Sequence, residues 1–281
     1  MPSTTGFTGR TAAVTGAGGG LGRALAIGLA RSGARLALAD IDGAGLAGTE
    51  RELARRCPGT NVRPTELDVR RRPAVEAWAD DTARFFGSVD VLVNNAGVGL
   101  VAPVEDMDED DFAWLMDVNV NGVVHGCRAF LPYLRQAPGS SLVNVASAFS
   151  RVGVPGLSAY CASKYAVEGF TEALRQEQRL ARSGVHVMTV LPGGIRTGIA
   201  ESARSSAAVD RDRLQAVGKL MMRHTPESAA RTILRGIRQH RRRLYVGADA
   251  VALDVLRRVL GVGAEPFVRF GAGRLLPVRW K

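Results

Sequence analysis

Short apolar runs alternate with longer amphipathic stretches along most of this chain, and this alternation restricts its fold more than any other feature. An apolar run followed by an amphipathic stretch and a further apolar run is typical of a parallel sheet with helices on both faces. Seven runs have the length and composition of strands: Thr11–Thr15, Arg35–Asp40, Asn61–Leu67, Val89–Asn94, Ser141–Ala146, Val185–Leu191 and Leu244–Val246. Helical stretches begin near Leu21, Ala44, Pro73, Asp108, Ser158 and Pro226. We therefore predict an α/β fold, a doubly wound parallel sheet of about seven strands in a single domain.

Several of these helix starts carry recognisable signals. Asp108 precedes an acidic first turn and Ser158 precedes Ala-Tyr, so both suit the N-cap position. Pro73 and Pro226 suit the first helical position. Residues 193–225 interrupt the alternation and are rich in Gly, Ser, Ala and Arg. Because long irregular segments in compact domains commonly have a function, we expect a lid or substrate loop there.

The formal net charge of +10 is concentrated in the C-terminal quarter of the chain. Residues 1–203 carry 20 Lys or Arg against 21 acids, whereas residues 204–281 carry 17 against 6. Such a segment can bind nucleic acid or anionic lipid, or it can form a solvated face or a subunit contact. No zinc-ligand pattern, aromatic-rich RNA motif or recognition helix accompanies the charge, so we expect no nucleic acid partner and no metal.

The cysteines and the N-terminus indicate the compartment. Cys57, Cys127 and Cys161 are odd in number and lack metal-ligand spacing, which suits a reducing cytoplasm. Residues 1–10 lack a basic region followed by an apolar core, and no uncharged run approaches about 18 apolar residues. We therefore expect a cytoplasmic chain that is neither secreted nor membrane-spanning.

A glycine-rich segment, Thr15-Gly-Ala-Gly-Gly-Gly-Leu-Gly22, follows the first strand and opens into a helix. Glycines allow a tight turn and a close backbone approach, and the helix N-terminus offers free N–H groups and a partial positive charge. A plain strand–helix connection is the alternative, because the spacing is not G-x-G-x-x-G. We expect this turn to bind the pyrophosphate of a dinucleotide through Gly16, Gly18, Gly20, Leu21 and Gly22.

An acidic residue at the end of the second strand indicates which dinucleotide the turn prefers. Asp40 ends the second strand, 18 residues after Gly22. A carboxylate there can accept hydrogen bonds from the adenosine ribose hydroxyls and repel a 2′-phosphate, so the sequence favours NAD over NADP. Arg23 and Arg35 are the cations that could oppose this prediction.

Tyr160 and Lys164 stand four residues apart, and on a helix that spacing places the phenol and the ammonium on one face. A phenol with a reference pKa of about 10 is a poor base, but a positive charge a few ångströms away stabilises the phenolate and lowers that pKa. Such a tyrosine can exchange a proton with an alcohol. An exposed surface pair is the alternative interpretation.

With the glycine turn and this pair in place, roughly residues 8–250 resemble the short-chain dehydrogenase/reductase family. Its Rossmann-type fold is the one expected above. Further motifs appear in the family's order, and they are Asp68-Val69, Asn94-Asn95-Ala96-Gly97, Asn119, Ser147, and Pro192-Gly193 followed by Ile195 and Thr197. The resemblance implies that these motifs, apart from Asn119 and Ser147, help to bind the cofactor. His125 lies close to Asn119, and we interpret it as structural.

The resemblance also implies the chemistry, which is hydride transfer between an alcohol carbon and nicotinamide. Tyr160 is expected to be the acid/base, while Lys164 holds the nicotinamide ribose and lowers the Tyr160 pKa. Ser147 is expected to hydrogen-bond the substrate oxygen. Asn119 is expected to hold a water that links Lys164 to solvent.

The substrate is less constrained than the reaction. Phe149, Val152, Val154 and Leu157 follow Ser147, and Leu220-Met221-Met222 lies in the expected lid; these residues could line an apolar pocket or simply pack. We expect a secondary alcohol or ketone on a steroid-like, terpenoid or long-chain skeleton. The alternatives are an NADP-preferring carbonyl reductase, a sugar-nucleotide epimerase, which the short chain disfavours, and a non-enzymatic NAD sensor or scaffold.

Residues 251–281 form a basic extension beyond an expected catalytic domain at 1–250. Apolar residues recur there at helical spacing, and they are Val251, Ala252, Val255, Leu256, Val259 and Leu260. Core packing or an oligomer contact is the favoured interpretation, and weak peripheral membrane contact is the alternative. By resemblance we expect a homodimer or homotetramer joined through helices at about Asp108–Leu134 and Ser158–Ala181.

Overall fold

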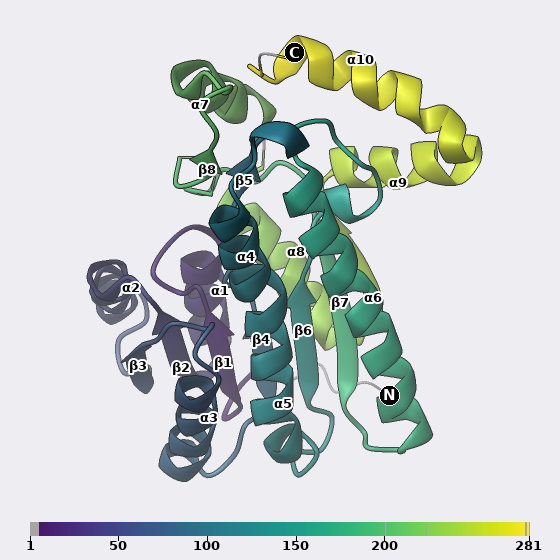
Figure 1. Ribbon diagram of the computed structural model, residues 1–281. Helices are drawn as coiled ribbons and strands as arrows, with labels where there is room; N and C mark the ends of the chain where they lie inside the picture. Colours follow the sequence, from purple (N-terminus) through teal and green to yellow (C-terminus); the bar gives the residue numbers. More distant parts are fainter. Residues whose placement is uncertain (1–5, 200, 223, 279, 281) are drawn as a thin grey trace.

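Seven parallel strands form the centre of the molecule, as the sequence predicts (Figure 1). The computed structural model describes residues 6–199, 201–222, 224–278 and 280. The sheet order is β3-β2-β1-β4-β6-β7-β9, so the chain moves outward from β1 in one direction and then from β4 in the other. The strands are β1 (Thr11–Thr15), β2 (Arg35–Asp40), β3 (Val62–Glu66), β4 (Val91–Asn94), β6 (Ser141–Val145), β7 (His186–Pro192) and β9 (Arg243–Val246).

Burial explains why the central strands β1, β4 and β6 consist of mostly apolar runs. Every residue of β1, β4 and β6 is buried, because helices cover both faces of the sheet. On one face lie α1 (Gly20–Arg31), α2 (Gly43–Arg56) and α8 (Pro226–Arg238). On the other lie α3 (Arg72–Phe86), α5 (Gly122–Leu134) and α6 (Ser158–Leu180), as Figure 1 shows. All six predicted helix starts fall within one residue of helices in the structure.

Of the two predicted N-caps, Asp108 is confirmed and Ser158 is wrong. Asp108 caps α4 (Glu109–Met116), and its carboxylate accepts the Asp110 N–H at 2.8 Å. Ser158 is not a cap, because a turn that joins Leu157 N–H to Val154 O places Leu157 in the cap position. Ser158 is consequently the first helical residue.

Residues 193–225 are more regular than the sequence predicts. A two-residue strand, β8 (Arg204–Ser205), pairs with β5 (Leu100–Val101), and α7 (Arg211–Met221) follows it. The prediction of an irregular loop is therefore wrong for α7, which is capped by Asp210. The β8 strand forms through a distant partner, so local periodicity carries no sign of it.

The C-terminal extension forms two helices joined by a short 3₁₀ turn. They are α9 (Ala248–Leu260), η4 (Gly261–Ala264) and α10 (Glu265–Leu275). The apolar stripe of α9 does not pack in the core, since Val255 is 51% exposed and Val259 is 75% exposed. The buried side of α9 is instead set by Ala250 and Asp254, so the expectation of core packing is wrong for this stripe. Within the described ranges, no helix is long and apolar enough to cross a membrane.

Candidate active site

The predicted site residues meet at the carboxyl edge of the sheet, although they come from distant parts of the sequence. The glycine turn follows β1, Asp40 ends β2, and the Asn95 motif follows β4. Ser147 follows β6, and Pro192 ends β7. Ligands of open α/β sheets bind outside this edge, where the strand order reverses between β1 and β4.

The turn between β1 and α1 requires glycine for steric reasons. Gly16 and Gly20 adopt positive φ angles of 66° and 47°, which side chains disfavour. A Cβ on Gly22 would lie 1.9 Å from Gly16 O, so the first turn of α1 packs directly on the backbone before it. Leu21 is buried and anchors that turn in the core.

The turn also leaves room for an anion. A Cβ on Gly19 would meet no atom within 4 Å. Gly19 is the N-cap of α1 and supplies no side-chain cap, so no side chain competes for the first N–H groups of this helix. These features fit a pyrophosphate, which free N–H groups and the helix dipole attract.

Asp40 lies against this turn. Its Oδ2 accepts the Gly18 N–H at 2.7 Å, and its Oδ1 accepts the Asp42 N–H at 2.9 Å. A Cβ on Gly18 would lie 2.9 Å from the Asp40 carboxyl group. The carboxylate therefore stands beside the glycine turn, where the ribose of a dinucleotide is expected.

The two arginines that could favour a 2′-phosphate are used elsewhere. The Arg23 side chain donates to Thr49 Oγ1 at 2.9 Å and to the backbone oxygens of Gly18 and Gly45. Arg35 begins β2 and donates to Phe86 O at 2.9 Å. That position is at the opposite edge of the sheet from Asp40.

Asp68 and Val69 follow β3, at the adenine side of the expected site. Hydrogen bonds from the Arg70 guanidinium hold the pKa of the Asp68 carboxyl below its ordinary value. Val69 is buried and packs over Gly122. His125 Nδ1 lies 3.0 Å from Val69 O, so His125 contacts the backbone of this segment.

The Asn95 motif connects β4 to the glycine turn. Asn95 Nδ2 donates to Thr15 O at 2.9 Å and to Gly16 O at 3.2 Å. The Ala96 N–H donates to Thr15 Oγ1 at 3.0 Å. A Cβ on Gly97 would lie 3.2 Å from Lys164 Nζ, so this motif reaches from the turn to the catalytic pair.

Asn119 lies in a π-helical turn (Asp117–Asn121) between α4 and α5, and such turns are frequent at functional sites. Its Oδ1 accepts the Val98 N–H at 2.8 Å. Its Nδ2 donates to Val98 O and to Ser163 Oγ, both at 3.0 Å. Both Nδ2 hydrogens are therefore used, and only an oxygen of Asn119 could hold the predicted water.

Tyr160 and Lys164 lie one turn apart on α6, with Ser147 beside them. Lys164 Nζ is 5.7 Å from the centre of the Tyr160 ring and donates to Val145 O at 3.4 Å. The Ser147 hydroxyl accepts the Phe149 N–H at 3.1 Å and acts on the Tyr160 phenol to lower its pKa. The predicted serine, tyrosine and lysine are thus brought together by the fold.

Burial shifts the pKa values of both Tyr160 and Lys164. Burial raises the pKa of Tyr160 to about 12, and the Ser147 hydrogen bond offsets only part of that effect. Burial lowers the pKa of Lys164 to about 8. The effect of Lys164 on the Tyr160 pKa stays a prediction, because burial is the main cause of the raised value.

The segment after β7 closes the other side of the site. The Gly193 N–H donates to Val246 O at 2.9 Å, and Ile195 is buried. A Cβ on Gly20 would lie 3.1 Å from the Thr197 side chain. Thr197 therefore lies over the glycine turn, and Pro192 begins the segment that carries it.

Sequence reasoning missed a buried ionic cluster behind Ser147. Glu168 is 4% exposed and accepts hydrogen bonds from Arg151 at 3.0 Å and from Ser150, whose Oγ lies 2.5 Å from the carboxylate. Ser150 Oγ also lies 2.7 Å from Ser147 O, and Arg151 donates to Asp254 of α9 at 2.8 Å. One signal was present, since Glu168 stands four residues after Lys164 and so shares its helix face.

The comparisons with known proteins agree with this geometry. The family model for short chain dehydrogenases matches residues 10–208. The putative oxidoreductase SadH of Mycobacterium tuberculosis is 42% identical over 96% of this chain and 98% of its own length. A short-chain dehydrogenase/reductase from Burkholderia phymatum, solved in complex with NAD, is 32% identical, with a TM-score of 0.82 over 94% of this chain and 96% of its own. Levodione reductase of Leifsonia aquatica is 34% identical over 71% of this chain and 74% of its length. Because the family model and a relative of nearly the same length both match, this chain belongs to the short-chain dehydrogenase/reductase family.

Proposed function

We propose that this protein is an NAD(P)-dependent oxidoreductase that interconverts an alcohol and a carbonyl compound. The observation that carries the proposal is the assembly of Ser147, Tyr160 and Lys164 beside a glycine turn that fits a pyrophosphate. Similar proteins support a nicotinamide cofactor, since the Burkholderia phymatum structure contains NAD. An alcohol dehydrogenase from Thermococcus sibiricus, 26% identical, was solved with 5-hydroxy-NADP.

In the proposed reaction Tyr160 accepts the hydroxyl proton of an alcohol, or donates a proton to a carbonyl oxygen. Ser147 hydrogen-bonds the same oxygen and stabilises the charge that develops on it. Lys164 places a cation behind the phenol, and Asn119 fixes the backbone at Val98 beside the lysine. A bound nicotinamide supplies the hydride donor or acceptor, and its oxidised ring adds positive charge.

With a pKa of about 12, the Tyr160 phenol is almost entirely protonated at neutral pH. It can act as a base only if its partners lower that pKa. A base works best when its pKa lies near the working pH, so substrate oxidation requires a large downward shift of that pKa. Cationic Lys164 is one source of that shift. Its own lowered pKa makes its charge sensitive to pH just above neutrality.

We further propose that NAD is preferred over NADP. The support is Asp40, whose carboxyl group stands beside Gly18, where the ribose is expected. Arg35 does not oppose this, because it lies at the start of β2 and donates to Phe86 O. The Arg23 guanidinium donates to Gly18 O and Gly45 O and is the cation nearest to Asp40 in this turn. Asp40→Ser should reduce the preference for NAD over NADP by about tenfold, since an anion that repels the 2′-phosphate is removed. An unchanged ratio of kcat/KM values for the two cofactors would refute this assignment.

The proposed substrate is a secondary alcohol or ketone on a hydrophobic skeleton, of the steroid-like, terpenoid or long-chain kind. Tyr160 packs beside buried Leu100, Leu115 and Ala159, and the Phe149 ring lies 6.4 Å from its ring. Apolar surroundings of this kind bind apolar substrates. The rest of the expected lining contributes less, because Val152 is a core residue and Met221 is 43% exposed; the side chain of Leu220 lies outside the described residues.

A substitution at the phenol tests the enzymatic role against a role as an NAD sensor or scaffold. Tyr160→Phe should lower turnover by about a thousandfold or more while NAD binding changes little, because only the proton carrier is lost. Tyr165→Phe is the matched control, since Tyr165 is a partly exposed phenol on the same helix. The readout is nicotinamide absorbance with a panel of alcohols and ketones, and NAD affinity by calorimetry. A Tyr160→Phe protein with near-normal turnover would contradict the mechanism, and wild-type binding of NAD without turnover of any panel compound would favour a sensor.

We also propose that the protein is cytoplasmic and forms a homodimer or homotetramer through α4, α5 and α6. The support is the family resemblance together with exposed apolar side chains on these helices, Phe112, Tyr165 and Leu180. Analytical ultracentrifugation decides the oligomeric state. A monomer at micromolar concentration would refute the assembly.

A further inference from the structure

The extension formed by α9, η4 and α10 exposes far more apolar surface than the rest of the chain. Sixteen large hydrophobic side chains are exposed among the described residues, and nine of them fall within residues 251–280. Those nine are Val251, Val255, Val259, Leu260, Val262, Phe267, Phe270, Leu275 and Trp280. Exposed apolar groups that gather in one segment mark a surface that binds something.

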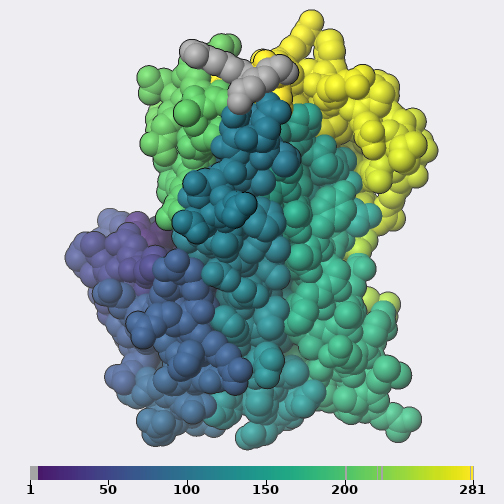
Figure 2. Space-filling view, in the orientation of Figure 1, coloured from purple at the N-terminus to yellow at the C-terminus, as the bar shows by residue number. Residues whose placement is uncertain are grey.

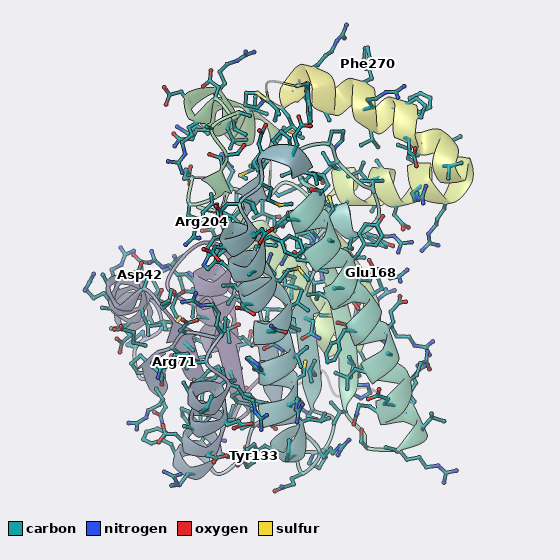
Figure 3. The ribbon with its side chains drawn as sticks, in the orientation of Figure 1. Asp42, Arg71, Tyr133, Glu168, Arg204 and Phe270 are labelled. Atoms are coloured by element: carbon teal, nitrogen blue, oxygen red, sulfur yellow. The ribbon has the colours of Figure 1, made fainter. Side chains whose placement is uncertain are left out.

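Cations accompany this apolar surface. Residues 248–281 contain six Arg or Lys against three acids, of which Asp254 is buried and pairs with Arg258. On α10, Phe267, Phe270 and Arg274 are spaced so that they share one face, and the Arg274 guanidinium lies 4.2 Å from the centre of the Phe270 ring. Figure 3 shows Phe270 on the outer side of α10. The face therefore presents aromatic rings and positive charge together.

The extension is a fixed platform rather than a loose tail. Asp254 of α9 is buried and pairs with Arg151, and Ala264 and Ala272 are buried. After α10 the chain returns across the fold, where Val278 pairs with Val209. The space-filling view shows α9 and α10 in yellow at one end of the molecule (Figure 2). Their exposed face is therefore held in place by contacts on the opposite side.

This platform lies close to the substrate side of the site. A Cβ on Gly156 would lie 3.3 Å from Val278 and 3.5 Å from Trp280. Leu157, three residues before Tyr160, packs with Leu276 and Val278. A partner bound to α10 would thus lie beside the loop that precedes α6, the helix that carries Tyr160 and Lys164.

We propose that the exposed face of α9, η4 and α10 docks on an anionic phospholipid membrane surface. Aromatic and aliphatic side chains enter the headgroup region, while arginines pair with lipid phosphates. A second copy of the chain fits this face less well. A two-fold contact places the same patch against itself, which brings Arg274 toward its own counterpart.

Vesicle co-sedimentation of the full chain tests the proposal and needs no turnover, so its result is independent of the proposed enzymatic function. Wild-type protein should sediment with vesicles of phosphatidylcholine that contain a third phosphatidylglycerol. It should bind vesicles of phosphatidylcholine alone about tenfold more weakly, and high salt should reduce the binding, because exposed charges are screened.

Substitutions on α10 separate the apolar contribution to vesicle binding from the electrostatic contribution. Phe267→Ser with Phe270→Ser should weaken vesicle binding by about tenfold, and separately Arg274→Gln by about fivefold, because each removes groups from the docking face. The matched control is Phe85→Ser with Arg84→Gln, an exposed apolar and basic pair near the end of α3, outside the proposed subunit contacts. Circular dichroism and the melting temperature confirm that each variant is folded.

Three results would overturn the proposal. Wild-type protein could fail to sediment with anionic vesicles at low salt, or the phenylalanine variant could bind as well as the control. Alternatively, the phenylalanine substitutions could reduce the oligomeric mass in ultracentrifugation without changing vesicle binding, which would assign the face to a second copy of the chain.

Discussion

Replacement of Lys164 by methionine should stabilise the folded protein at neutral pH while it destroys activity. Lys164 is 4% exposed, and burial lowers its pKa from the ordinary 10.5 to about 8. A drop of that size means that holding the ammonium in the fold costs about 3 kcal/mol. The only hydrogen bond of Nζ within the described residues is to Val145 O at 3.4 Å, which is long and so recovers little of this cost. Methionine keeps a similar apolar stem without the charge.

The net gain should be about 2 kcal/mol once the lost contact is subtracted, which corresponds to about 4 °C in melting temperature for a chain of this length. The sign of its pH dependence follows from proton binding. Below about pH 8 Lys164 is charged in both states, and the cost is fully present. Between pH 8 and 10.5 the unfolded chain holds the proton that the folded chain has released, so wild-type stability rises. The advantage of the methionine variant should therefore disappear by about pH 10.5.

Thermal unfolding followed by circular dichroism at pH 7 and at about pH 10 measures this effect, with turnover recorded in parallel. Lys219→Met is the control, because Lys219 is exposed on α7 and its replacement should change neither quantity much. Turnover of the Lys164 variant should fall by about a hundredfold or more. The reasoning is refuted by a variant that is less stable than the wild type at pH 7, or by an advantage that does not shrink toward pH 10.

Three further predictions follow from the geometry of the site. Gly22→Ala should weaken NAD binding in calorimetry by about tenfold or more, because the new Cβ would lie 1.9 Å from Gly16 O; normal affinity would contradict the role of this turn. Glu168→Gln should cost about 3 kcal/mol in urea unfolding, because it removes the buried charge that faces Arg151, and a loss as small as that of an exposed pair would show that the cluster contributes little. Initial rates of alcohol oxidation should rise with pH and rates of carbonyl reduction should fall, since oxidation needs the ionised form of Tyr160, whose pKa the protein raises; parallel profiles for both directions would exclude Tyr160 as the acid/base.

The sequence by itself determined the positions of the strands, their alternation with helices, the glycine turn and the candidate catalytic residues. These features depend on local patterns. Apolar runs of strand length, glycine where backbones touch, and Tyr160 and Lys164 at a four-residue spacing are all visible without coordinates. Parallel strands place their carboxyl ends at one edge of the sheet. The location of the expected site therefore follows from the motifs that come directly after the strands.

Only the tertiary structure decided the charge states and the distant contacts. The pKa of Tyr160 depends on burial, which raises it to about 12. Arg151 meets Glu168 and Asp254 through contacts that span up to 103 residues of sequence, and β8 exists because a distant strand pairs with it. The apolar stripe of α9 has core periodicity, yet it lies exposed because buried Asp254 fixes the opposite face of the helix against the fold. Desolvation and long-range pairing depend on which segments surround a group in space, and periodicity along the chain carries no record of that.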